Sequence, residues 1–170
     1  MLSGREKRID MKNNSPQKAH SLSLRSIFRC MMEDGYYPVF EQNHIQFGME
    51  DNIAVVEHEE GILSVRLFFS IEEDTYDLFL EASNMTMLKT FMVKPAVLDD
   101  MKNFMFSCEM YCDNVRDFRR FFPRACASVK EALAAHKSEM KKLILANEVA
   151  NATIPARDGS MTGIARKLLS

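Results

Sequence analysis

Side chains that could support acid–base or metal chemistry are few and scattered in this 170-residue chain. The four histidines, His20, His44, His58 and His136, occur singly and lack the nearby cysteines or histidines of a metal site. His44 and His58 fall on neighbouring predicted strands, where they could face each other with Glu57 close by. A solvated or hydrogen-bonded histidine is the commoner case, so we assign this pair no catalytic role and predict no metal site.

Carboxylates also give no convincing catalytic pattern. Adjacent acids occur at Glu59–Glu60, Glu72–Glu73 and Asp99–Asp100. Two of these pairs fall in predicted turns and the third at a predicted helix start, where acids suit the positive end of the helix dipole. The chain also lacks the G-x-S-x-G and H-E-x-x-H motifs and a glycine-rich phosphate loop. We therefore predict a protein that is not an enzyme, with no catalytic residue and no cofactor.

The four cysteines, Cys30, Cys108, Cys112 and Cys126, contain no C-x-x-C pair. Cys108 and Cys112 are four residues apart on a predicted strand, so they share one face with apolar neighbours. This indicates buried thiols in a reducing compartment. The first residues develop no apolar signal segment, and no run of 18 apolar residues occurs, so we expect a cytoplasmic protein without a membrane span.

Charge is distributed unevenly along the chain, although the net value is only −2. Residues 33–81 contain thirteen acids and a single base, Arg66, whereas the segments before and after are basic. The acids either pair with basic helices or form a face for a basic partner. A cluster of arginines also lies beside three phenylalanines, a pattern that can hold phosphate and stack bases. The isoelectric point near 6.1 argues against nucleic acid, so we expect these side chains to neutralise the sheet and fill the core: Arg116, Arg119, Arg120, Arg124, Phe118, Phe121 and Phe122.

Apolar periodicity predicts the element order α-β-β-β-α-β-β-α. This is an α+β fold, with an antiparallel sheet of about five strands and helices on one face. A capping box from Ser70 to Glu73 should start the second helix, and Pro123 should kink or break the last one. The predicted helices are Ser23–Asp34, Ile71–Asn84, a short piece over Val115–Phe121, and a separate or kinked long helix that has Pro123 in its first turn and runs toward Glu148. The predicted strands are His44–Glu50, Asn52–Glu59, Ile62–Ser70, Leu88–Lys94 and Lys102–Cys112, with a turn within Pro95–Asp100 whose tip is Asp99–Asp100.

These elements predict one domain over residues 22–148. Residues 1–21 are polar, basic and aperiodic, which is typical of a disordered tail. Residues 149–170 contain Pro155 and Gly159 and are expected to form a mobile C-terminal tail.

The layout resembles a known family. The element order, the helix exit Glu33-Asp34-Gly35-Tyr36, the helix after Ser70 and the final long helix are similar to the YbjN-type family of proposed sensory transduction regulators. That family shares its α+β fold with type III secretion chaperones. The resemblance covers about residues 22–145 and implies a small non-enzymatic domain, often dimeric, that binds protein segments or acts in regulation. It carries over no individual functional residue.

Methionine is abundant, with thirteen in the chain, and such flexible side chains suit adaptable binding surfaces. Met101 and Met105, together with the acidic turn at Glu57, Glu59 and Glu60, form our candidate partner surface. An incompletely covered sheet is also where an extended partner segment can add as a strand. We predict a protein-binding or chaperone-like regulatory module that binds a protein segment or forms a homodimer. The alternative is a regulatory domain that binds a small ligand or nucleic acid.

Overall fold

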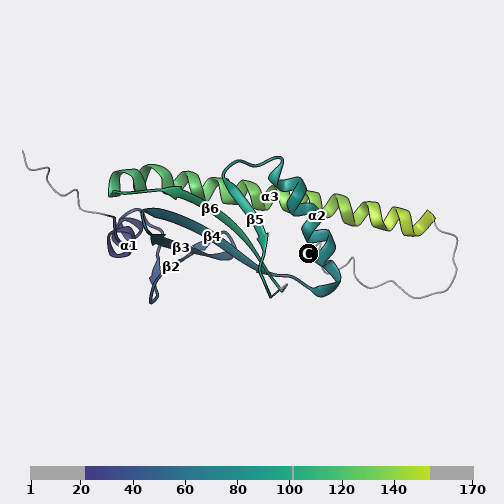
Figure 1. Ribbon diagram of the computed structural model, residues 1–170, viewed down its shortest axis with the longest axis horizontal. Coiled ribbons are helices and arrows are strands. Elements are labelled where there is room, and N and C mark those ends of the chain that lie inside the picture. The colour runs from purple at the N-terminus through teal and green to yellow at the C-terminus, as the bar shows by residue number, and fades with distance from the viewer. Residues whose placement is uncertain (1–21, 101, 154–170) are drawn as a thin grey trace, which may run out of the picture.

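The computed structural model describes residues 22–100 and 102–153 and confirms the predicted α+β class. Within these residues, three helices accompany one antiparallel sheet of six strands in the spatial order β1-β2-β3-β4-β6-β5 (Figure 1). The elements are α1 (Leu24–Glu33), β1 (Val39–Phe40), β2 (Ile45–Met49), β3 (Asn52–Glu59), β4 (Ile62–Ser70), the 3₁₀ turn η1 (Glu73–Thr75), α2 (Tyr76–Met87), β5 (Val93–Val97), β6 (Asn103–Tyr111) and α3 (Val115–Thr153).

The core lies between one face of the sheet and the helices. Alternate residues of β4 point inward, so Leu63, Val65 and Leu67 are fully buried. Phe104 and Phe106 of β6 continue the same buried layer beside them. The inward face is therefore a continuous apolar surface, which the helices cover.

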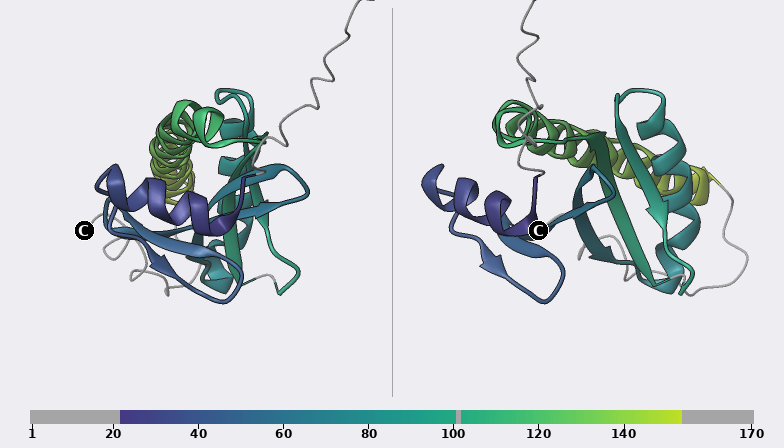
Figure 2. Two further views of the ribbon diagram at one scale, coloured as in Figure 1. Left: turned by 90° about the vertical axis from the view of Figure 1, so that its left-hand side faces the viewer. Right: turned by 60° about the vertical axis from the view of Figure 1, so that its left-hand side comes forward.

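The long helix α3 runs along the sheet and contacts β4, β5 and β6 (Figure 1). Both α1 and α2 pack against α3, on the same side of the sheet (Figure 2). The Ser23 hydroxyl caps the start of α1 by accepting from the Ser26 backbone N–H. Gly35, with φ +82°, ends that helix in the left-handed conformation that glycine adopts readily.

Two strand predictions were incomplete or wrong. The structure adds β1, a two-residue strand that pairs with Ile45 and Gln46 of β2. The strand predicted over Leu88–Lys94 lies instead at Val93–Val97, and the turn predicted within Pro95–Asp100 lies at Asp99–Asp100, its predicted tip. Pro95 is compatible with β5 because this strand is at the sheet edge, where proline is tolerated.

The predicted capping box at Ser70 and the predicted helix break at Pro123 are both absent from the structure. Ser70 is the last residue of β4 and forms no capping box; η1 precedes α2, and neither has a side-chain cap. Pro123 lies inside α3, which continues on both sides of it as one helix. Phe118 and Phe122 before the proline and Ala125 after it are all buried. This tertiary packing maintains the helix despite the missing backbone donor.

The long helix continues to Thr153, beyond the predicted domain boundary at Glu148. The predicted tails, residues 1–21 and most of 149–170, lie outside the residues that the structure describes. Among the described helices, none combines the length and apolar character needed to cross a bilayer.

Candidate functional site

The sheet face that points away from the helices is the candidate site. Side chains on this face form rows across β3, β4, β6 and β5, because paired residues lie directly opposite each other. No described helix covers these rows, since all three helices pack on the other side (Figure 2). The face is therefore available to solvent or to a partner.

One row is apolar. Phe68 of β4 pairs with Met105 of β6, which pairs with Ala96 of β5. Ile53 precedes Ala54, the partner of Leu67, and so lies beside Phe68 in the same row. Ile53 is 64% exposed and Phe68 is 40% exposed. Large apolar side chains in one contiguous exposed row are typical of an interaction surface.

The adjoining rows hold a compact ion-pair network. The Arg66 guanidinium contacts Glu57 Oε2 at 2.5 Å and Glu109 Oε1 at 3.6 Å. Lys94 Nζ donates to Glu109 Oε2 at 3.0 Å, and the Ser107 hydroxyl donates to Glu109 Oε1 at 3.0 Å. The Lys94 ammonium, followed by the Ser107 hydroxyl, holds the pKa of Glu109 below its usual value. Two acids and two bases thus balance each other beside the apolar row.

The predicted surface residues are only partly brought together. Glu57 and Met105 both lie on the open face, but Met105 is four positions along β6 from Glu109, whose row contains Glu57. This corresponds to about 13 Å along the strand. Glu59 and Glu60 are exposed at the β3–β4 turn, beyond the acidic end of the face. Met101 lies outside the described residues.

The two edges of the sheet offer little for strand addition. At one edge, β1 contributes only two residues. At the other, β5 contains Pro95, which lacks the backbone donor, and Lys94, a charged residue of the kind that discourages pairing. The broad face is consequently the more suitable contact surface.

Sequence reasoning missed several exposed apolar residues. Ile53 and Phe68 of the apolar row were not singled out, although their positions in predicted strands could have placed them on the outer face. Leu88, Phe91 and Met92 were assigned to a strand, but they lie between α2 and β5. Phe91 is 88% exposed, so this connection is a second apolar surface.

The histidine and cysteine candidates do not form a reactive centre. His44 pairs in the sheet register near Glu57, and its ring contacts Asn43 and Gln46. His58 instead contacts the Cys112 carbonyl oxygen at 2.9 Å, so the two histidines do not meet. All four cysteines are buried and free. Across the described residues, no group of three histidine, cysteine or acidic side chains is placed to hold a metal ion.

Part of the arginine and phenylalanine cluster serves the fold. Phe118 and Phe122 stack in the core with ring centroids 4.9 Å apart. Arg119 pairs with Glu33 and Asp34 at the end of α1. Two of the three aromatic rings are therefore inaccessible to bases, and one arginine joins two helices.

Comparison with known proteins gives a match in structure alone. No model of a protein family and no curated protein matches the sequence. The structure resembles YbjN, a "putative transcription regulator" from E. coli, with a TM-score of 0.55, 11% identity, and coverage of 66% of this chain and 93% of that chain. The chain shares the YbjN fold. An uncharacterized protein from Methanothermobacter thermautotrophicus matches with a TM-score of 0.53, 14% identity, and coverage of 71% of this chain and 98% of that chain. The predicted resemblance in fold is thereby confirmed.

Proposed function

We propose that this chain is a regulatory protein-binding domain that contacts its partner through the open face of the sheet. The observation that carries the proposal is the apolar row formed by Ile53 and Phe68, which are exposed, and Met105, which is half-buried. Burial of such a row is favourable, and the adjacent ion pairs provide a polar rim. The description of YbjN as a regulator supports the same functional class. The proposed activity includes no catalytic step.

The size of the face suggests a reversible complex. Four neighbouring strands about 4.8 Å apart, with about 3.3 Å for each of the nine residues of β4, give roughly 600 Å² of flat surface. Standard stable interfaces bury about 800 Å² on each partner. We therefore propose a separate partner protein that binds and dissociates. A segment held against this face in an extended form would make the domain chaperone-like.

The proposed setting is the cytoplasm. Four buried thiols without a disulfide suit a reducing compartment. The nucleic-acid alternative gains no support from the arginine cluster, since Phe118 and Phe122 are buried.

The proposal is tested by comparing partner recovery for two variants. The first carries Phe68→Ser and Met105→Lys, which places a polar group and a charge in the apolar row. The matched control, Phe91→Ser, removes an exposed ring between α2 and β5. Far-UV circular dichroism establishes that both variants are folded. Proteins that co-purify with the wild-type chain are identified by mass spectrometry. Each identified partner is then purified separately, and its affinity for wild type and for each variant is measured by calorimetry.

We expect a defined partner whose affinity falls about tenfold or more with the double variant and is unchanged with Phe91→Ser. Equal affinity for wild type and the double variant would refute the open face as the binding site. Loss with Phe91→Ser alone would assign binding to the connection between α2 and β5. Light scattering that shows a dimer, dissociated by the double variant, would make a second copy of the chain the occupant.

A further inference from the structure

A pocket lies on the helix-covered side of the sheet, away from the open face. It has a volume of about 390 Å³ and is bounded by α2, α3 and the neighbouring ends of β4 and β6. Phe69, Phe79, Phe104, Leu133 and Met140 supply much of its apolar lining. Small-molecule sites are typically hollows of about 300–1,000 Å³ that are mostly apolar with a few polar groups. The pocket therefore has the size and lining of a ligand site.

Its inner wall is aromatic and uncharged. The His136 ring is 3% exposed, and its centroid lies 5.2 Å from that of Phe79 and 5.0 Å from that of Phe104. Burial lowers the pKa of His136, which favours the neutral imidazole. Its Nε2 atom is 3.4 Å from the Ser83 hydroxyl, which donates to the Phe79 carbonyl oxygen. Ser83 does not line the pocket, so this Ser–His pair does not present a nucleophile to a bound molecule.

The rim of the pocket is positively charged. Lys137 and Lys141 both line it and are four residues apart on α3, so they lie on the same side of the helix. Both are exposed, and neither forms an ion pair with a carboxylate of the described residues. Their ammonium groups are thus available to an anion.

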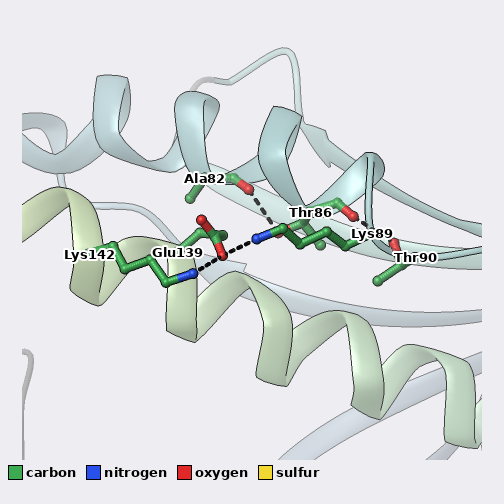
Figure 3. A network of polar contacts seen from close by, with 6 residues as sticks. All are labelled: Ala82, Thr86, Lys89, Thr90, Glu139 and Lys142. Atoms are coloured by element: carbon green, nitrogen blue, oxygen red, sulfur yellow. Dashed lines mark hydrogen bonds and ion pairs between the residues drawn. The ribbon is translucent and has the colours of Figure 1, made fainter.

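The nearest acid on this stretch of α3 is already paired. Glu139 Oε1 contacts Lys89 Nζ at 2.5 Å and Lys142 Nζ at 2.8 Å (Figure 3). Thr86 lies beside this contact and donates to the Ala82 carbonyl oxygen within α2 (Figure 3). The Lys89–Glu139 contact joins the segment just after α2 to α3, and Glu139 is engaged with two other lysines. The rim lysines are consequently not neutralised by it.

We propose that this pocket binds a single-chain anionic amphiphile, with its carboxylate at Lys137 and Lys141 and its apolar body among the phenylalanines. The site is separate from the protein-binding face and adds a small-molecule function to it. Charge argues against the chain's own C-terminal segment as the occupant, since residues 154–170 contain Arg157, Arg166 and Lys167 but only one acid, Asp158. A basic segment and a basic rim repel each other.

The test uses the full chain and dodecanoate below its micelle concentration, titrated by calorimetry. Dodecan-1-ol is the uncharged probe of equal length. Lys137→Gln with Lys141→Gln removes the rim charge. Arg116→Gln with Arg124→Gln is the matched control, because it removes the same charge from exposed positions of α3. The two pairs are separated by at least 13 residues, or about 20 Å along the helix. Ile144→Trp places a large ring at the pocket wall and leaves both lysines in place.

We expect one dodecanoate per chain, weaker binding of the alcohol, and a loss of about tenfold or more with the double lysine variant. The arginine control should bind as wild type does, and Ile144→Trp should abolish binding. No binding of dodecanoate would overturn the proposal. Equal binding of acid and alcohol, or no effect of the lysine variant, would refute the carboxylate site. Binding of many molecules that Ile144→Trp leaves unchanged would show adsorption elsewhere. Association with phosphatidylglycerol vesicles without binding of free dodecanoate would identify a lipid surface as the target and overturn the proposal.

Discussion

Leu67 and Phe68 are neighbours on β4 whose side chains point to opposite faces of the sheet. Leu67 is fully buried between its cross-strand neighbours Ala54 and Phe106, whereas Phe68 lies on the open face. Substituting each with alanine therefore tests the assignment of the two faces. The expected costs differ enough to be measured in one experiment.

The cost of Leu67→Ala follows from its burial. Removal of three buried carbon atoms costs about 2.4 kcal/mol, at about 0.8 kcal/mol for each. A residual cavity of roughly 50 Å³ adds about 1.2 kcal/mol, since the hydrogen-bonded strands on both sides cannot collapse into it. We expect a total loss of about 3–4 kcal/mol in the free energy of unfolding. For Phe68→Ala we expect a smaller loss of about 2 kcal/mol, because the ring is partly exposed and its removal leaves no closed cavity.

The measurement is urea unfolding followed by far-UV circular dichroism, because the chain has no tryptophan for fluorescence. Equal costs for the two variants would mean that the outer face is covered, and a larger cost for Phe68→Ala would mean that the faces are reversed; either result would contradict the assignment. A cost near zero for Leu67→Ala would refute its place in the core.

Three further predictions concern single features of the fold. Pro123→Ala should raise the free energy of unfolding by about 1–3 kcal/mol, because alanine restores a helical donor and relieves crowding of the preceding turn; a lower melting temperature would contradict this. Burial lowers the pKa of His136, so the unfolded chain takes up its proton first as the pH falls below about 6.5. Wild type should therefore lose melting temperature between about pH 7.5 and 5.5 more steeply than His136→Phe, and equal slopes would refute the role of burial. Burial raises the pKa of Cys126 to about 12 and that of Cys112 to about 11. Iodoacetamide should therefore label these thiols far more slowly in the native protein than in urea, as measured by mass spectrometry; similar rates would show that they are accessible.

The sequence predicted β2, β3 and β4 well because their patterns are local. Apolar residues alternate along each strand, and the short turns leave antiparallel pairing as the only simple arrangement. Gly61, with φ +80°, supplies the left-handed conformation that the β3–β4 turn needs. Period-2 alternation then separates inward from outward residues, and Leu63, Val65 and Leu67 on the inward side are fully buried.

The errors arose where tertiary contacts outweigh local preference. The run from Leu88 to Met92 is apolar enough to resemble a strand, yet its side chains are exposed between α2 and β5. Pro123 is unfavourable in a helix by itself, but buried residues on both sides hold α3 together.

The open face and the pocket also depend partly on local sequence patterns and partly on tertiary contacts. The alternation identified Met105 and Glu57 as surface residues, but only the strand order β3-β4-β6-β5 brings Ile53 and Phe68 into the row with Met105. The pocket depends on α2, α3 and β6, which are distant in sequence, so no local sequence pattern predicts it.

The long helix α3 has two parts that differ in local stability. Its 39 residues span about 58 Å, and its C-terminal end extends beyond the strands (Figure 1). Residues as far as Met140 bury side chains against the domain, whereas the side chains of residues 145–150 are all exposed. Backbone amides of the first part should exchange hydrogen only on global unfolding, while those of the last turns exchange through fraying. Ile144, in the pocket lining, marks the boundary. A molecule held there would move that boundary toward the C-terminus. Slower hydrogen exchange of the amides near the end of α3 would therefore report that the pocket is occupied.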